Sequence, residues 1–166
     1  MTSNAQSSGA SARVSLTQVH AFQQAVEDHR FLSEYLANVQ RSATLFNEPE
    51  AHERLSAMRA FLAEHVIGHF GFEERRVFPH LLESARDPAI RQAVLELVDE
   101  HRAMRTGVRK LRREIRHAQV SGDARSLARL EESFREFLDV LQAHAVKEDN
   151  ILLAFKQSRR QAIRLQ

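Results

Sequence analysis

The stretch that decides the fold is residues 94–115, VLELVDEHRAMRTGVRKLRREI. Most of its apolar side chains recur every three or four residues, which places them along one face of an α-helix. They are Val94, Leu97, Val98, Met104, Val108, Leu111 and Ile115. Asp87 and Pro88 can cap and begin this helix, and Ser121-Gly122-Asp123 breaks it. The sequence therefore predicts one long amphipathic helix between these two signals.

Three more segments show the same periodicity. The first helix is predicted to begin near Ser15 or Thr17, where a hydroxyl can cap the free amides, and to end before Asn47-Glu48-Pro49. The second helix follows it, and Pro79 is a place where it kinks or ends early. The fourth helix carries apolar residues as far as Phe155. Short connections make consecutive helices antiparallel neighbours, so we expect an all-α, up-down-up-down four-helix bundle.

The composition agrees with a single helical domain. The chain has 166 residues, of which 43% are hydrophobic, and it has only 5 glycines and 3 prolines. This length allows a sizeable core, and the scarcity of turn residues favours long helices over a sheet. We expect residues 15–157 to form the bundle, residues 1–14 to be a disordered polar tail, and residues 158–166 to be a basic tail.

Charge and cysteine content exclude several classes of function. The formal net charge is only +2, so no strong field favours nucleic acid as a partner, and Arg105–Arg116 is interpreted as a solvated helix face. The absence of cysteine excludes disulfides, thiolate metal sites and iron–sulfur ligation. The chain shows no secretory signal, and no uncharged apolar run approaches the roughly 18–20 residues that span a bilayer. We therefore expect a soluble, cytoplasmic protein that binds any metal through nitrogen and oxygen.

The two halves of the chain repeat each other. Val26-Glu27-Asp28-His29-Arg30 in the first helix matches Val98-Asp99-Glu100-His101-Arg102 in the third, 72 residues later. His69-x-x-x-Glu73-Glu74 in the second helix matches His144-x-x-x-Glu148-Asp149 in the fourth, 75 residues later. A helical hairpin is thus duplicated, with a small difference in loop length. The repeat predicts a site of approximate two-fold symmetry.

Six of the repeated residues have the types and spacing of metal ligands. At roughly 100° per residue, a histidine and a glutamate four residues apart lie about 40° apart on one helix face and can reach the same ion. At about 1.5 Å per residue, all the motifs lie roughly 20 Å from one end of an antiparallel bundle. We therefore expect one layer of metal ligands made of His29, His69, Glu73, His101, His144 and Glu148.

The number of these ligands indicates two ions. Zinc is satisfied by about four ligands, whereas two ions with bridging carboxylates and a bridging oxygen use more. Carboxylate and imidazole without thiolate favour iron or manganese, and zinc could take their place. His65 lies one turn before His69 and is a candidate for an extra ligand or for a residue that supports one. By contrast, we expect His20, His52 and His117 at the surface.

These motifs resemble a known family. The block HFGFEERRVFP at residues 69–79, Glu100-His101 and His144-x-x-x-Glu148 are similar to the hemerythrin-like, HHE cation-binding domain, over roughly residues 15–157. The resemblance implies a four-helix bundle with a di-iron centre, bridged by oxygen and carboxylate, whose ligands are the same six residues. It also raises an alternative for the last ligand. In oxygen-carrying hemerythrins the last carboxylate ligand is an aspartate, five residues after the histidine ligand of the fourth helix. That residue is Asp149 here, although the parallel with Glu73 favours Glu148.

The resemblance also implies a function. Oxygen-carrying hemerythrins have a further histidine one turn before the ligand in the third helix, where this chain has Leu97. A set of four histidines and two glutamates is similar to that of bacterial di-iron proteins implicated in nitric oxide response and iron-centre repair, although the repair proteins usually carry a cysteine-bearing segment. We expect O2 or NO to bind at an open iron position, for sensing, scavenging or storage. The alternative is a redox enzyme acting on NO, peroxide or O2 with an electron-donor protein. The sequence leaves this choice and the oligomeric state open.

Overall fold

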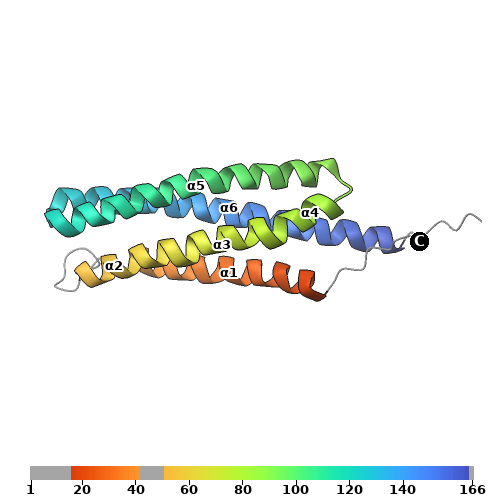
Figure 1. Ribbon diagram of the computed structural model, residues 1–166, viewed down its shortest axis with the longest axis horizontal. Coiled ribbons are helices and arrows are strands. Elements are labelled where there is room, and N and C mark those ends of the chain that lie inside the picture. Colours follow the sequence, from red (N-terminus) through yellow and green to blue (C-terminus); the bar gives the residue numbers. More distant parts are fainter. Residues whose placement is uncertain (1–15, 42–50, 165–166) are drawn as a thin grey trace, which may run out of the picture.

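The computed structural model describes residues 16–41 and 51–164, with side chains placed for residues 20–39 and 51–160. Every secondary-structure element within these ranges is helical. The long helical rods lie lengthwise side by side, and each runs opposite to the rod before it in the chain (Figure 1). The expected all-α, up-down-up-down four-helix bundle is therefore confirmed. None of the described helices combines the length and the apolar character needed to cross a membrane.

The first hairpin consists of α1 and a long second rod. Helix α1 (Leu16–Arg41) begins between the two expected capping residues, and its expected end near Asn47 lies outside the described residues. The rod is continuous over residues 51–84. It comprises α2 (Ala51–Phe61), the π-helical turn η2 (Leu62–Val66), α3 (Ile67–Phe72), the π-helical turn η3 (Glu73–Val77) and α4 (Phe78–Ser84). Pro79 does not end the rod, because it falls in the first turn of α4, where proline is well accommodated.

The second hairpin consists of α5 (Pro88–Ser121) and α6 (Ala124–Arg164). The side chain of Asp87 accepts a hydrogen bond from the amide of Ala89 at 2.8 Å, as expected for a capping residue. Gly122 ends α5 with a φ of 62°, the left-handed conformation that glycine adopts readily. Helix α6 continues to Arg164, so most of the segment from residue 158 that we assigned to a tail extends the helix. The polar segment 1–14 lies outside the described residues.

Two π-helical turns distinguish the rod from α6. In η2 the amide of Ile67 bonds to the carbonyl of Leu62, and in η3 the amide of Phe78 bonds to that of Glu73, in both cases five residues back. Each π-helical turn holds one residue more than an α-helical turn and so shifts the phase of the helix, and such turns are frequent at functional sites. The two turns flank α3, which carries His69.

A polar layer divides the apolar core into two clusters. One cluster contains Phe70 and Met104, and the other contains Phe78 and Leu97. His101 illustrates the position of the layer, because it lies on α5 between Leu97 of one cluster and Met104 of the other. The helices pass through this layer without a break in the backbone, so they present polar side chains at a fixed depth in an otherwise apolar interior.

Candidate metal centre

All six predicted ligands lie in this polar layer, and none is more than 5% exposed. They come from every long helix of the bundle: His29 from α1, His69 from α3, Glu73 from η3, His101 from α5, and His144 and Glu148 from α6. We call these six residues the ligand layer. Their ligand atoms fall into two groups, in each of which all atoms lie within 4.8 Å of one another. One group is His29, His69 and Glu73, and the other is Glu73, His101, His144 and Glu148.

Glu73 belongs to both groups. Its Oε1 lies 2.9 Å from Nε2 of His69 and 3.2 Å from Nε2 of His29, whereas its Oε2 lies 3.3 Å from Nε2 of His101. Oε2 of Glu148 lies 3.6 Å from Nε2 of both His29 and His144. Each carboxylate therefore stands between imidazoles of the two hairpins, which is where a carboxylate shared by two ions would lie.

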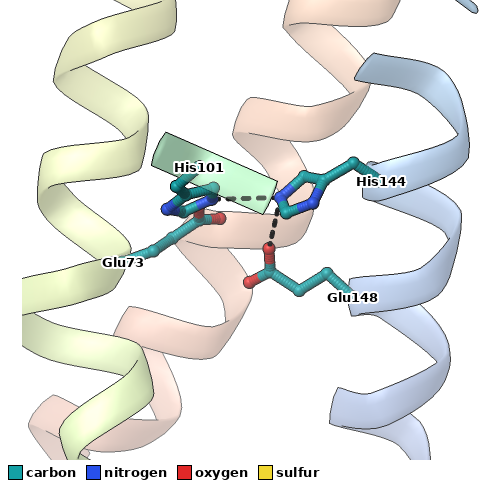
Figure 2. A group of neighbouring side chains, drawn as sticks. All are labelled: Glu73, His101, His144 and Glu148. Carbon is teal, nitrogen blue, oxygen red and sulfur yellow. Dashed lines mark hydrogen bonds and ion pairs between the residues drawn. The ribbon is translucent and has the colours of Figure 1, made fainter. Parts of the chain in front are cut away.

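Figure 2 shows the second group, in which His101 and His144 point toward each other and toward the two glutamates. Their Nε2 atoms are 3.0 Å apart. Two nitrogens that bind one ion at right angles, each at about 2.1 Å, would also be about 3.0 Å apart. In the first group the rings of His29 and His69 are 4.8 Å apart between centroids, the same separation as the rings of His101 and His144. The two histidine pairs thus have the same ring separation, although their ring planes meet at 81° and 51°.

Several polar atoms of the ligand layer have no hydrogen-bond partner among the described residues. They are Nε2 of His29, both ring nitrogens of His69 and both carboxylate oxygens of Glu73 and Glu148. The Nε2 and carboxylate atoms lie 2.9 Å to 3.6 Å from one another, so they form ion pairs only where an imidazole carries an extra proton, and burying such charges costs roughly several kcal/mol for each ion. Cations bound by nitrogen and oxygen would satisfy these Nε2 and carboxylate atoms at once. The residues present therefore fit a cation site.

A further set of carboxylates orients the four imidazoles. Each histidine turns Nε2 toward the centre of the layer and Nδ1 toward an acidic side chain of a neighbouring helix. The distances from Nδ1 to oxygen are 3.0 Å for His29 and Asp149, 3.5 Å for His69 and Asp28, 3.0 Å for His101 and Glu74, and 2.7 Å for His144 and Glu100. A carboxylate bonded to Nδ1 keeps the proton on that nitrogen and leaves Nε2 available to a metal, as for His29, His101 and His144. Nδ1 of His69 faces Asp28 without forming a hydrogen bond. We call these four acids the outer carboxylates.

The outer carboxylates form a closed ring around the bundle. Asp28 of α1 faces the rod, Glu74 of the rod faces α5, Glu100 of α5 faces α6, and Asp149 of α6 faces α1. On α1 and α5 the acid directly precedes the ligand, and on the rod and α6, which run the opposite way, it directly follows the ligand. One step back along an upward helix and one step forward along a downward helix turn in the same sense, by about 100°. Every acid therefore reaches the next helix in the same direction.

Two of the outer carboxylates also pair with cations. Arg105 donates from Nη1 to Oε1 of Glu74 at 2.6 Å and from Nη2 to Oε2 at 3.1 Å. Lys147 donates from Nζ to Oε1 of Glu100 at 2.6 Å. Among the described residues no lysine or arginine comes within ion-pair distance of the other two outer carboxylates, Asp28 and Asp149. The cation pairs therefore belong only to the acids that face the histidines of the second hairpin.

The carboxylates of the layer hold protons on two of its imidazoles. Burial lowers the pKa of His29, but Glu148 and Glu73 outweigh burial and raise it to about 11. The pKa of His144 is also raised, because Glu148 and the neighbouring acids outweigh burial. Burial raises the pKa of Glu73, but its contacts with three histidines outweigh burial and hold the pKa well below its usual value. A cation that enters this layer must therefore displace protons from imidazole.

The two alternative ligands lie away from the centre of the layer. Asp149 bonds to Nδ1 of His29 and its side chain is 43% exposed, whereas its neighbour Glu148 is fully buried among the ligands. His65 is exposed, and its ring packs against Phe31 and Phe61 with centroid separations of 5.6 Å and 5.0 Å. The structure therefore brings together the six predicted residues and leaves both alternatives outside. His20, His52 and His117 are exposed, as expected.

Sequence reasoning missed most of the residues around the layer. We assigned no role to Asp28, Glu74 and Glu100, although an acid stands directly beside a ligand in all four motifs, and this signal could have identified them. Arg105 and Lys147 have no comparable signal, because the repeat does not preserve them. The corresponding residues of the first hairpin, 72 and 75 positions earlier, are Ser33 and Phe72.

Comparison with known protein families agrees with this site. The model of the hemerythrin HHE cation binding domain matches residues 20–155, a range that contains all six residues of the ligand layer. No match to the chain was found among curated proteins or among solved structures. Because the family match extends over most of the chain, the chain belongs to the hemerythrin HHE cation-binding domain family.

Proposed function

We propose that this chain is a non-haem di-iron protein that binds a small diatomic ligand, O2 or NO, at an iron coordination position left open by the protein. The observation that carries the proposal is the position of Glu73, whose two oxygens face imidazoles of different hairpins. A single ion has no use for such a carboxylate, whereas two neighbouring ions share it. Ligands of carboxylate and imidazole, without thiolate, support iron over softer metals, with manganese or zinc as substitutes.

The residue one turn before His101 supports an open coordination position. Leu97 is fully buried and belongs to the apolar cluster that also contains Val77 and Phe78. Leucine offers no ligand atom, so six side chains serve both ions, fewer than two six-coordinate ions require. The apolar surroundings favour a small uncharged molecule over a bulky polar one.

The residues of the chain would prepare this site. When bound, the iron pair supplies a Lewis acid and electrons for a diatomic ligand. Glu73 and Glu148 would hold the two ions together, and the four imidazoles would bind through Nε2. The outer carboxylates would keep the proton of each imidazole on Nδ1, away from the metal. Sensing, scavenging or storage of the diatomic ligand are all compatible with this arrangement.

A redox enzyme acting on NO, peroxide or O2 is a second candidate, and one observation favours it. Asp149 is partly exposed and bonds to the buried Nδ1 of His29 at 3.0 Å, so it could pass a proton between solvent and the ligand layer. Turnover would need an electron-donor protein as a partner. Participation in the repair of iron centres belongs to this second class.

Metal content and the visible spectrum of chain purified from iron-supplemented cells test the proposal. We expect about two irons per chain and near-ultraviolet oxo-to-iron absorption that changes on reduction and on exposure to O2 or NO. Glu73→Gln should lose iron and this absorption, whereas His65→Ala, which changes an exposed histidine outside the layer, should keep both. One zinc or no metal in the unchanged chain would contradict the dinuclear site. Steady-state consumption of NO or peroxide with an added reductant would favour the enzyme.

A further inference from the structure

We propose that the two metal positions differ in affinity, and that Arg105 and Lys147 make the position at His101 and His144 the weaker one. This inference rests on the proposed dinuclear site and adds a property that the ligand residues alone do not specify. The order in which the two positions fill is then set by side chains that touch no metal.

The inner ligands do not make the position at His101 and His144 the weaker one, since its group has four residues and the group at His29 and His69 has three. Each position has two imidazoles with the same centroid separation, 4.8 Å. Glu73 turns one oxygen toward each position, and Oε2 of Glu148 is equally far, 3.6 Å, from a histidine of each. A lower affinity at the second position must therefore come from outside the ligand layer.

The outer carboxylates are not equivalent. The acids behind His101 and His144 share their charge with cations, since Glu74 forms a two-point ion pair with Arg105 and Glu100 pairs with Lys147. Behind His29 and His69 stand Asp149 and Asp28, and within the described residues the structure places no lysine or arginine beside either. Asp28 accepts a hydrogen bond from an uncharged amide, Nε2 of Gln24, at 2.7 Å.

This difference acts on the metal through two effects of the same sign. A carboxylate at Nδ1 makes an imidazole a stronger donor at Nε2, and a cation that shares the carboxylate's charge weakens this effect. The cations also repel a metal ion directly. Solvent screens this repulsion only in part, because the side chain of Arg105 is 25% exposed and lies over the ring of Phe70, and that of Lys147 is 35% exposed. Both effects weaken binding at the second hairpin.

The sequence repeat offers a direct way to exchange this property between hairpins. Ser33 corresponds to Arg105 by the 72-residue offset, and Phe72 corresponds to Lys147 by the 75-residue offset. By the symmetry of the repeat, an arginine in place of Ser33 would lie near Asp149, as Arg105 lies near Glu74. Removing a cation from one hairpin and adding one to the other should therefore have opposite consequences.

The experiment equilibrates the full chain, loaded with Co²⁺, against chelator-buffered free Co²⁺ and measures bound ions and the visible cobalt spectrum. We expect a plateau at about one ion per chain over at least a tenfold range of free Co²⁺ before the second ion binds. His29→Ala should abolish the first step, and His101→Ala should leave it, which assigns the order. Lys147→Met and Arg105→Met should each tighten the second step by about tenfold and leave the first unchanged. Ser33→Arg should weaken the first step and narrow the plateau.

A control and two outcomes make the test decisive. Lys156→Met removes a positive charge from an exposed site two turns beyond Glu148 and should alter neither step. If Lys147→Met loosens the second step, the lysine merely anchors Glu100 and the inference is wrong. Two ions that bind in one unresolved step would also overturn it while leaving the dinuclear site intact. Fewer than two ions at saturating Co²⁺ would overturn the dinuclear site itself.

Discussion

The two hairpins carry the same ligand motifs but support them differently. In the first hairpin the second rod has π-helical turns on both sides of α3, and the outer carboxylates that face its histidines, Asp149 and Asp28, have no lysine or arginine partner among the described residues. In the second hairpin α6 is a regular α-helix of 41 residues, and the outer carboxylates that face its histidines, Glu74 and Glu100, pair with Arg105 and Lys147. The repeated motif thus conserves the atoms that face the centre, while the helix and the charges behind them have diverged.

The π-helical turns should allow the rod to tolerate the deletion of a residue. A π-helical turn holds one residue more than an α-helical turn, so the rod can lose a residue there and become regular. Helix α6 has no extra residue to lose, because it is α-helical throughout and its amides bond to carbonyls four residues back. The comparison between the hairpins therefore predicts unequal responses to matched changes.

Deletion of a single residue should give the largest difference in stability between the two hairpins. Deletion of Glu64, exposed in η2, should convert that turn to an α-helical one and cost less than about 2 kcal/mol in the free energy of unfolding. Deletion of Asp139, exposed at the matching place in α6, should rotate the preceding residues by about 100° relative to His144 and cost more than about 4 kcal/mol. Urea unfolding of both variants measures this difference, and equal losses would show that the π-helical turns confer no tolerance.

The two shared glutamates should also differ in how much each contributes to the affinity for iron. Glu73 lies 2.9 Å to 3.3 Å from three histidines, whereas Glu148 lies 3.6 Å from two. We expect Glu73→Gln to lower the affinity for iron by about 100-fold or more, and Glu148→Gln by about tenfold. Iron per chain after dialysis against a graded chelator measures both affinities, and circular dichroism checks that the helices persist. A greater loss from Glu148→Gln would contradict this ranking.

The stability of metal-free chain should depend on pH through both hairpins. His29 is faced by Glu73, Glu148, Asp149 and the ring of His69, and its pKa is raised from 6.5 to about 11. A raised pKa contributes stability that is complete below pH 6.5 and is lost as the pH rises toward 11. We therefore expect the free energy of unfolding of the chelated chain to fall over this window, by at most about 1.4 kcal/mol per pH unit from this group. The Tm should fall with it.

Two variants identify the source of this pH dependence. His29→Ala should flatten the fall in Tm, and His144→Ala, in the second hairpin, should flatten it as well because the pKa of His144 is also raised. Metal binding should tighten over the same window, since deprotonated imidazole is the form that binds. A metal-free chain that becomes more stable between pH 7 and pH 9 would contradict the assignment.

The smallest difference concerns a glycine. Gly68 is exposed in α3, and a Cβ added there would meet no atom within 4 Å. The second hairpin already has alanine at the matching position, Ala143, which is also exposed. Gly68→Ala should raise the free energy of unfolding by about 0.5–1 kcal/mol, and Ala143→Gly should lower it by a similar amount. Thermal unfolding of the two variants checks this, and a destabilising Gly68→Ala would mean that the π-helical turns need glycine between them.

The fold and the layer of six residues were predictable because regular spacing carries both. Apolar residues every three or four positions predicted the helices, and the depth of each motif along antiparallel helices predicted that His29, His69, His101 and His144 would meet. Glu148 was preferred to Asp149 as a ligand because its spacing from His144 equals that of Glu73 from His69, and the structure has Glu148 in the layer and Asp149 beside it. Periodicity and repetition are local properties, so a single sequence displays them.

The remaining features depend on contacts that spacing does not encode. The π-helical turns were not predicted, because the buried residues on either side of them still recur at helical intervals, for example Leu62, Val66 and Phe70. The pairing of Lys147 with Glu100 joins two helices, and neither residue stands out in a chain with 24 basic residues. The extent of α6 was missed because basic residues are as compatible with an exposed helix as with a tail.

The division of the core into two apolar clusters bears on how cooperatively the protein unfolds. The backbone of every long helix runs through the ligand layer, but the side chains of one cluster do not join those of the other. Without metal, only the polar contacts of the ligand layer and the helix backbones connect the two clusters, so we expect the two ends of the bundle to open as separate units in hydrogen exchange. Ions bound by residues from all the long helices would fasten the ends together, and opening either end would then require releasing the metal.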